Sequence, residues 1–450
     1  MTTIKRLPWF HLVLLSACSG LFATPPNIIL ILTDDQGWNN TQVPMIEGQE
    51  DTRSDFYLTP NMQRIADAGM TFSQAYAPHP VCSPSRHSIQ QGISPAKLKK
   101  TTNVGSNYPD YIQTPTIPQI LKKTFPEYRA AHFGKWHMWA HPAEKGYDFS
   151  DGRTGNQTGR QLSTDQTKFW VHEDPKRSES ITDDAVEFIR HEAIAGNPFY
   201  LQVSHYFIHL SAEAHAATLE KHKARTPGKV HTAYWYAAML DDLDQAVGRL
   251  LDVVEEMNLS DNTYIFFTSD NGGTARQYPG MNKPLRAGKG SYYEGGIRVP
   301  FMVTGPGIKA GTYSTVPVIG YDLLPTFARL AGVEGSLPAE IEGGSLVGVL
   351  KNQGRETVER ERNGLYFSRQ VDAVLIQGDN KLIRTHRTGE LQLYNLAADL
   401  SETNDLSQTQ PALRDQMFND LKQWMDDNDV MTPSPDAPRG RRAQQDDDDI

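Results

Sequence analysis

The stretch Asn27-Ile-Ile-Leu-Ile-Leu-Thr33 is an unbroken run of isoleucine and leucine between two polar ends. A strand of this composition is apolar on both faces, which is typical of a parallel sheet covered by helices on both sides. The run stops at Asp34-Asp35-Gln36-Gly37, so two carboxylates follow it directly. We therefore expect residues 27–33 to form a buried strand, with Asp34 and Asp35 at its carboxyl end.

Weaker apolar runs recur along the chain and alternate with helical patterns. The runs cover residues 128–133, 199–204, 263–268 and 299–303. Helical patterns cover residues 59–69, where Thr59 and Pro60 stand at the start, and residues 182–192 and 232–257. Strands alternating with helices predict an α/β fold in which helices sandwich a large, mostly parallel sheet.

The sequence changes character from about Arg360. Runs typical of antiparallel strands cover residues 364–368, 373–377, 381–384 and 391–396, and residues 411–427 form an amphipathic helical pattern. We expect a smaller C-terminal α+β domain of antiparallel strands and a helix at residues 346–430, after a larger domain at 27–345. The acidic tail at 431–450 is expected to be disordered.

The first residues resemble an export signal. Lys5 and Arg6 precede a largely apolar run, and we expect residues 1–17 to be a signal peptide. Leu15-Ser16-Ala17-Cys18 matches the pattern cut by lipoprotein signal peptidase, which predicts a lipidated Cys18 followed by a linker at 18–26. The protein is then exported and lipid-anchored to a bacterial membrane, the outer membrane, facing periplasm or exterior. Ordinary cleavage after Ala23 is the alternative.

Charge and cysteine content narrow the classes of partner. The 450 residues carry 44 Lys and Arg against 54 Asp and Glu, a net charge of -10, so a nucleic-acid partner is not expected. An anionic substrate must therefore be attracted by local cations. Only Cys18 and Cys82 occur, and they either form a disulfide or serve separate purposes.

Polar side chains follow the predicted strands, and parallel strands bring their carboxyl ends to one edge of a sheet. Asp270 and Asn271 follow the run at residues 263–268, and with Asp34 and Asp35 they offer only oxygen donors. Such donors suit Ca²⁺ or Mg²⁺ better than Zn²⁺. Taken alone, Asp34 and Asp35 are more typical of a solvated turn, and Asp270 and Asn271 can likewise form a plain turn. Only together do the two pairs predict a metal site.

Basic and imidazole side chains occupy the same edge. They are Lys135 and His137 after the run at 128–133, His205 and His209 after the run at 199–204, and Lys289 before the run at 299–303. Taken singly, each of these side chains is typical of a solvated surface.

Cys82 stands next to a predicted helix start. Ser83-Pro84-Ser85 places Pro in a first turn, so Cys82 is expected at the positive end of a helix dipole, which lowers the pKa of a thiol. The alternative is a buried or merely reactive cysteine.

The segment Cys82-x-Pro84-x-Arg86 is similar to the signature of the formylglycine-dependent sulfatases in the alkaline-phosphatase-like superfamily. Further blocks occur in the family's order, and the resemblance extends from about Asn27 to Leu330. These blocks are Asp34-Asp35-Gln36-Gly37-Trp38, Gly134-Lys135-Trp136-His137, Ser269-Asp270-Asn271-Gly272-Gly273, Leu285-Arg286-Ala287-Gly288-Lys289-Gly290 and Tyr293-Glu294-Gly295-Gly296-Ile297-Arg298-Val299-Pro300. The chain departs from the family at Gln91-Gly92, where Thr-Gly is usual, and at Ser211, where Pro is usual.

The resemblance implies a nucleophile and a metal ion. A maturation enzyme would convert Cys82 to formylglycine (3-oxoalanine), and one hydroxyl of the hydrated aldehyde would attack sulfur. Residue 82 with Asp34, Asp35, Asp270 and Asn271 would bind Ca²⁺, with Mg²⁺ the less favoured ion.

The resemblance also implies roles for the basic side chains. Lys135 and Lys289 would hold sulfate oxygens, and Arg86 would steady residue 82. His209 would protonate the leaving oxygen and His137 would accept the proton from residue 82, with His205 competing for the role of acid.

The expected substrate is a sulfated glycan, because a lipoprotein on a bacterial envelope meets polysaccharides. Trp38, Trp139 and His141, together with Trp136, line the sugar site or belong to the core. Two alternatives remain open: a phosphonate monoester or phosphodiester hydrolase of the same superfamily, and a non-catalytic glycan-binding lipoprotein that keeps the Cys82 thiol.

Overall fold

The computed structural model describes residues 25–102, 113–160, 169–275, 280–335 and 337–430. The predicted signal peptide, the lipidation site at Cys18 and the acidic tail at 431–450 therefore lie outside the described residues. Among the residues that are described, no helix is long and apolar enough to cross a membrane.

An eight-stranded sheet forms the centre of the molecule, with the order β11-β2-β10-β9-β1-β7-β4-β5. Strand β1 (Asn27–Thr33) runs parallel to both neighbours, β7 (Phe199–Ser204) and β9 (Thr263–Ser269), and β4 (Arg129–Gly134) runs parallel to β7. Strand β10 (Phe301–Thr304) is antiparallel to β9. The outer strands are β2 (Met70–Phe72), β5 (Phe149–Ser150) and β11 (Thr312–Ser314).

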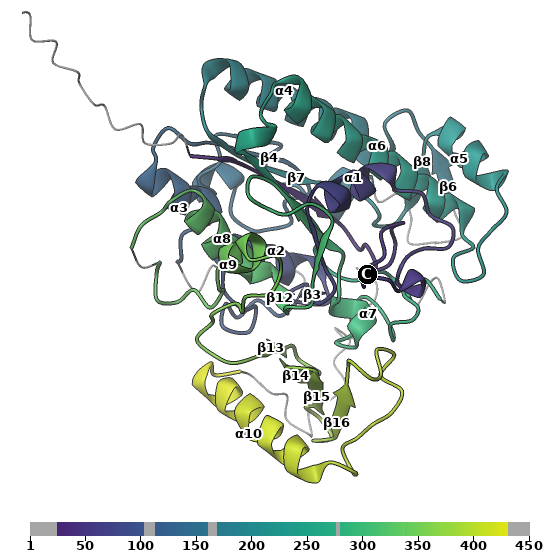
Figure 1. Ribbon diagram of the computed structural model, residues 1–450, viewed down its shortest axis with the longest axis vertical. Helices are drawn as coiled ribbons and strands as arrows, with labels where there is room; N and C mark the ends of the chain where they lie inside the picture. Colours follow the sequence, from purple (N-terminus) through teal and green to yellow (C-terminus); the bar gives the residue numbers. More distant parts are fainter. Residues whose placement is uncertain (1–24, 103–112, 161–168, 276–279, 336, 431–450) are drawn as a thin grey trace, which may run out of the picture.

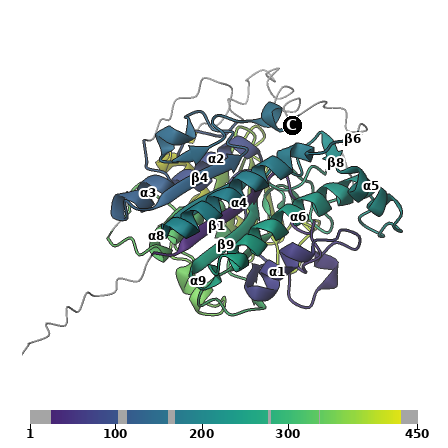
Figure 2. The ribbon, with the colours of Figure 1, turned by 90° about the horizontal axis from the view of Figure 1, so that it is seen from above.

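Helices cover both faces of this sheet (Figures 1 and 2). Ile29 and Ile31 of β1 pack toward α4 (Ser178–Ala195) and α6 (Tyr234–Glu256), near α1 (Pro60–Ala68) and α5 (Ala216–Lys223). Ile28, Leu30 and Leu32 pack toward the opposite layer. That layer contains α2 (Cys82–Gln91), α3 (Ile117–Thr124), α8 (Leu323–Leu330) and α9 (Val347–Lys351). Burial on both faces explains why the 27–33 run has no polar alternation.

A small antiparallel sheet follows near the C-terminus. It contains β13 (Leu365–Ser368), β14 (Asp372–Gln377), β15 (Asn380–Thr385) and β16 (Leu391–Asn395), each paired with the next. One face packs on α10 (Pro411–Asp427) through Trp424, and the other packs on the main body near α7 (Glu294–Ile297). The predicted fold class is confirmed, while the domain boundary near residue 345 stays a prediction.

The predicted elements differ from the observed ones mainly in length. Helix α4 begins before the predicted 182–192 pattern and continues to Ala195, where it is followed by Gly196 with a φ of 72°. Residues 299 and 300 do not belong to β10, because Pro300 has no N–H for a ladder and the N–H of Val299 donates to Ala75 O. Several short strands escaped prediction, among them β3 (Ala75–Tyr76), β6 (Phe169–Val171), β8 (Ala212–Ala214) and β12 (Val318–Ile319).

Candidate active site

An enclosed acidic cluster lies at the carboxyl ends of β1 and β9. Asp34, Asp35, Asp270 and Cys82 place one potential ligand atom each within 4.8 Å of one another, and all four residues are buried. Asp35 has a φ of 62°, and its N–H donates to Asp270 Oδ1 at 3.3 Å. The parallel pairing of β1 with β9 thus brings together carboxylates that are 235 residues apart.

Cys82 faces these carboxylates from the first turn of α2. Its thiol lies 3.3 Å from Asp34 Oδ1 and 3.7 Å from Asp35 Oδ1, and the side chain is 1% exposed. The expectation that the helix end lowers the pKa of this thiol is wrong for the unmodified residue. Burial, followed by the charges of Asp270 and Asp34, raises the pKa well above its usual value and outweighs the helix dipole.

Three cations neutralise the three carboxylates. Lys135 Nζ lies 2.6 Å from Asp34 Oδ2, and Lys289 Nζ lies 2.9 Å from Asp35 Oδ2. The remaining carboxylate, Asp270, accepts from Arg86, whose Nε and Nη2 each lie 2.8 Å from its Oδ2. Burial would raise the pKa of Asp34, but Lys135 and the other cations together hold it far below its ordinary value.

The cluster fits a hard divalent cation. The amide of Asn271 donates to Asp35 Oδ1 at 2.7 Å, while its own Oδ1 is buried without a hydrogen-bond partner among the described residues. An orphaned buried oxygen beside three carboxylates is a typical ligand arrangement for Ca²⁺ or Mg²⁺. The three carboxylates and the three cations of the cluster cancel in charge. A bound divalent cation would therefore leave an excess of positive charge, which would favour an anionic substrate.

Two of the histidines named as proton carriers from the sequence, His209 and His137, lie beside this cluster. His209 Nε2 is 3.8 Å from Asp35 Oδ2, and its Nδ1 lies 2.7 Å from Leu210 O. Burial, then Lys289, lowers the pKa of His209 to about 3. His137 adopts a φ of 53°, and burial followed by the charges of Lys135 and Arg86 lowers its pKa.

His205 differs from these two histidines. Its pKa is lowered to about 4 by burial alone, and both ring nitrogens are buried without a hydrogen-bond partner in the described part of the chain. The geometry therefore favours His209 over His205 as the imidazole that faces a substrate.

The aromatic residues expected at a sugar site separate into two groups. Trp38 is fully buried in the core, 4.7 Å from the Arg298 guanidinium, and its place does not favour the predicted sugar contact. Trp136 is also a core residue. Trp139 is half-buried with the Arg153 guanidinium 5.1 Å from its ring, and His141 Nδ1 accepts from Ala143 N at 3.2 Å. A sugar contact of Trp139 and His141 stays a prediction.

Sequence reasoning missed a buried ionic network beneath the loop that carries Lys289. Lys381 Nζ of β15 lies 2.8 Å from Glu294 Oε1 and 2.8 Å from Glu402 Oε1, and all three side chains are fully buried. Glu294 also accepts from Arg298 and Tyr76, at 3.0 and 3.1 Å. The available signal was Lys381 itself, a charged residue directly before Leu382 and Ile383 in a predicted strand.

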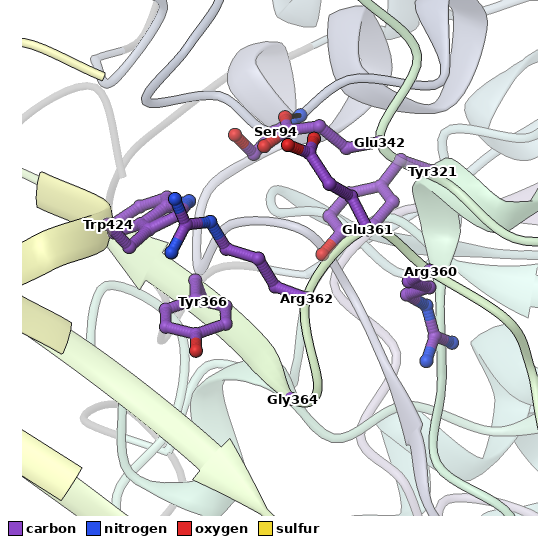
Figure 3. Close-up of a pocket in the computed structure, with 9 residues that line it drawn as sticks. All are labelled: Ser94, Tyr321, Glu342, Arg360, Glu361, Arg362, Gly364, Tyr366 and Trp424. Atoms are coloured by element: carbon purple, nitrogen blue, oxygen red, sulfur yellow. Dashed lines mark hydrogen bonds between the residues drawn. The ribbon is translucent and has the colours of Figure 1, made fainter. Parts of the chain in front are cut away.

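A separate cavity lies where the small sheet meets the main body, lined by Arg362, Tyr366, Trp424 and others (Figure 3). Its volume of about 20 Å³ suits about one water molecule. None of the residues of the acidic cluster lines it.

The fold and the site define a hydrolase class in which buried carboxylates, cations and a helix-borne residue act on an anionic ester. Residues 26–333 match the family described as Sulfatase, and the chain belongs to that family. It is a sulfuric ester hydrolase, so the non-catalytic alternative is not supported, and the alkaline-phosphatase-like fold implied by the resemblance is confirmed.

Relatives and solved structures agree with this assignment. The chain is 28% identical to a sulfatase of Formosa agariphila over 90% of both chains. It is 29% identical to the N-acetylgalactosamine-6-sulfatase of Sus scrofa, over 82% of this chain and 74% of the relative. The crystal structure of Ps i-CgsB in complex with k-i-k-neocarrahexaose matches with a TM-score of 0.77 and 26% identity, over 94% of this chain and 97% of that one.

Proposed function

We propose that this protein hydrolyses sulfate monoesters on carbohydrates, with residue 82 as nucleophile and a bound calcium ion. The observation that carries the proposal is the placement of Cys82 against Asp34 and Asp35, with Lys135 and Lys289 on the same carboxylates. The carbohydrate class is supported by the names of the relatives, which include an N-acetylgalactosamine-6-sulfatase and an N-acetylglucosamine-6-O-sulfatase.

A formylglycine at position 82 supplies, as its hydrate, the hydroxyl that attacks sulfur. The unmodified thiol suits this reaction poorly, because burial raises its pKa. Arg86 lies on the same helix one turn later and is fixed by its contacts to Asp270 and to Lys135 O, so it can orient residue 82.

Asp34, Asp35, Asp270 and Asn271 would hold the metal ion, and a divalent cation there would neutralise charge on a sulfate oxygen and make the attacking hydroxyl more acidic. Calcium is proposed ahead of magnesium because an enclosed set of carboxylate and amide oxygens suits its higher coordination number.

Lys135 and Lys289 bind the sulfate group. The Lys135 ammonium contacts Asp34 and the Lys289 ammonium contacts Asp35. A metal ion on these carboxylates would weaken both ion pairs and leave the two ammonium groups available to the substrate. Two buried ammonium groups stabilise the negative charge on sulfate oxygens strongly, since water is excluded around them.

His209 and His137 move the protons. His209 Nε2 has no hydrogen-bond partner in the described residues and is directed at the cluster, so it is placed to protonate the leaving sugar oxygen. Burial and Lys289 keep His209 neutral without substrate, and the negative charge of a sulfate raises its pKa again. His137 accepts the proton of the second hydroxyl of residue 82, so that the bond between residue 82 and the sulfate breaks, sulfate leaves and the aldehyde is restored.

We also propose that the chain is exported and lipid-anchored at Cys18 and that a formylglycine-generating enzyme modifies it. The Leu15-Ser16-Ala17-Cys18 pattern supports the anchor, and the Cys82-x-Pro84-x-Arg86 pattern supports the modification.

The first test combines peptide mass and activity. Protein co-expressed with a formylglycine-generating enzyme should show a peptide across residue 82 that is about 18 Da lighter than the thiol form, because an aldehyde replaces the thiol-bearing group, a change that lies outside the ordinary oxidation ladder. It should hydrolyse an aryl sulfate faster than an aryl phosphodiester, and lose activity on calcium chelation. An unmodified thiol with full activity contradicts the proposed nucleophile. Preference for the phosphodiester supports the other hydrolase class.

A further inference from the structure

A wide groove is lined by residues 283–286 of the catalytic-domain loop that presents Lys289. It has a volume of about 790 Å³ and is also lined by Val230 and by residues 401–403 of the C-terminal part. Cavities of 300–1,000 Å³ at domain junctions are typical ligand sites. The acidic cluster does not line this groove, so the groove is a second site.

Hydrogen bonds fix the groove to the catalytic centre. The amides of Asn39 and Asn40, in the loop after Asp35, donate to the carbonyls of Lys283 and Met281. Lys289 N donates to Gly273 O at 2.9 Å, two residues after Asn271. Lys283 and Lys289 are six residues apart, so their Cα atoms are separated by at most about 20 Å.

The exposed charge in the groove is mainly positive. Lys283 is exposed, and its ammonium forms no ion pair with any residue that the structure describes. The exposed Arg286 stacks on Tyr293, with its guanidinium 3.7 Å from the ring, and still faces solvent. Glu402 also lines the groove, but its side chain is fully buried and its carboxylate pairs with Lys381. Asp51 is the exposed carboxylate of the lining.

Apolar surface accompanies these charges. Val230 is 43% exposed, and Pro284 and Leu285 form the neighbouring wall. A sugar ring presents C–H groups on its faces and oxygens at its edge, so this mixture suits a carbohydrate better than a simple inorganic anion.

We propose that this groove binds a second, sulfated sugar unit of an oligosaccharide whose target sulfate is held at Lys289. The inference rests on the proposed carbohydrate sulfatase function and deepens it, since it makes the substrate a multiply sulfated chain rather than a monosaccharide. Lys283 supplies the contact to the second sulfate, and the Val230 and Pro284 surface supports the ring.

The test reverses charge in the groove and compares long with short substrates. Lys283→Glu and Val230→Glu should raise KM for a sulfated hexaose about three- to tenfold relative to KM for an aryl sulfate, because each adds repulsion at an exposed site. Val230→Lys should lower the same ratio. The probes are k-i-k-neocarrahexaose and a hexasaccharide bearing N-acetylgalactosamine 6-sulfate, and added salt should shrink the differences.

Lys123→Glu is the matched control, because Lys123 is an exposed lysine at the end of α3, on another side of the molecule from α7 (Figure 1). An equal change in Lys123→Glu, or an equal rise in KM for both substrate sizes, overturns the groove as a subsite. Wild-type protein that hydrolyses the aryl sulfate but neither hexaose overturns the carbohydrate substrate and the groove together. No hydrolysis of any sulfate ester, by protein with formylglycine at residue 82, contradicts the proposed function itself.

Discussion

Two buried histidines, His205 and His209, follow the same strand, but only one of them is placed for proton transfer. His205 directly follows β7, whereas His209 stands four residues later and reaches to within 3.8 Å of Asp35. The family resemblance favoured His209 as the acid and kept His205 as a competing candidate. The difference is geometric, because the bend after His205 brings only the second imidazole into contact with the charged cluster.

His209→Gln should therefore lower kcat for a sugar sulfate by about 10²–10⁴, the usual contribution of a positioned general acid. The loss should be much smaller for an aryl sulfate with a very acidic phenol, because that leaving group departs without a proton. Steady-state kinetics on both substrates measure the difference.

His205→Gln is the matched control, since it removes an imidazole equally buried on the same segment. It should keep most of the activity on both substrates. Losses of the same size in the two variants, or a loss independent of the leaving group, would assign the proton transfer to another residue.

At the scale of elements, a catalytic loop depends on a strand from the other part of the chain. Lys289 and Glu294 belong to one loop and the short helix α7 that follows it, and Glu294 is bound by Lys381 of β15. Arg286 of the same loop donates to Glu402 O at 2.8 Å. The small antiparallel sheet thus fixes the backbone that places Lys289 beside Asp35.

Lys381→Met should leave Glu402 buried without a cation and Glu294 with Arg298 alone, and the free energy of unfolding should fall by about 3–5 kcal/mol. The activity per folded molecule should fall as well, because the Lys289 loop loses its support, and Lys381→Arg should restore part of it. Urea denaturation and kcat measure the two effects.

Lys422→Met removes a lysine whose ion pair with Asp426 on α10 is 60% exposed, and it serves as the control. An exposed pair contributes about 0–1 kcal/mol, so little change is expected. A Lys381→Met protein as stable and active as the control would show that the buried network does not hold the loop.

The long elements could be predicted because the pattern of apolar residues within each of them determines its structure. Residues 27–33 and 199–204 form strands with the predicted bounds, and 411–427 form the predicted helix. Strands of two or three residues, such as β3 and β12, were not predictable, since distant pairing alone creates them. The proximity of Asp34, Asp35 and Asp270 could be predicted because all three directly follow strands whose carboxyl ends lie at the same edge of the sheet. The raised pKa of Cys82 and the core position of Trp38 depend on tertiary burial, which no local pattern encodes.

At the scale of the whole molecule, the enclosed layers hold several histidines in their neutral form. Burial lowers the pKa of His132 to about 3 and that of His205 to about 4. His132 lies against Trp136 and Tyr147, with ring centroids 4.9 and 5.7 Å apart. These histidines therefore stay neutral in the folded state at pH values where the same side chains are protonated in the unfolded chain, whose histidines have a pKa of about 6.5.

We expect the free energy of unfolding to fall as pH drops from about 6.5 toward 4, by on the order of 1 kcal/mol per pH unit for each of these histidines. His132→Gln should reduce this slope by the contribution of one histidine, measured by urea denaturation across that range. Burial raises the pKa of Asp244 to about 6, so this carboxyl acts in the opposite sense, but it is common to both proteins and cancels.

His191→Gln removes an exposed histidine and gives the comparison, since its side chain is 69% exposed. Equal slopes for wild type and His132→Gln would mean that His132 takes up a proton in the folded state.

The enclosure of Cys82 sets an order of events during biosynthesis. A side chain that is 1% exposed, in the first turn of a helix under a completed sheet, cannot enter the active site of another enzyme. The proposed modification must therefore occur while the segment around residue 82 is still extended, before β1 pairs with β9, whose residues are synthesised much later. Folding and modification then compete in time. The active fraction of a preparation is decided while the chain is being made, and no later treatment of the folded protein raises it.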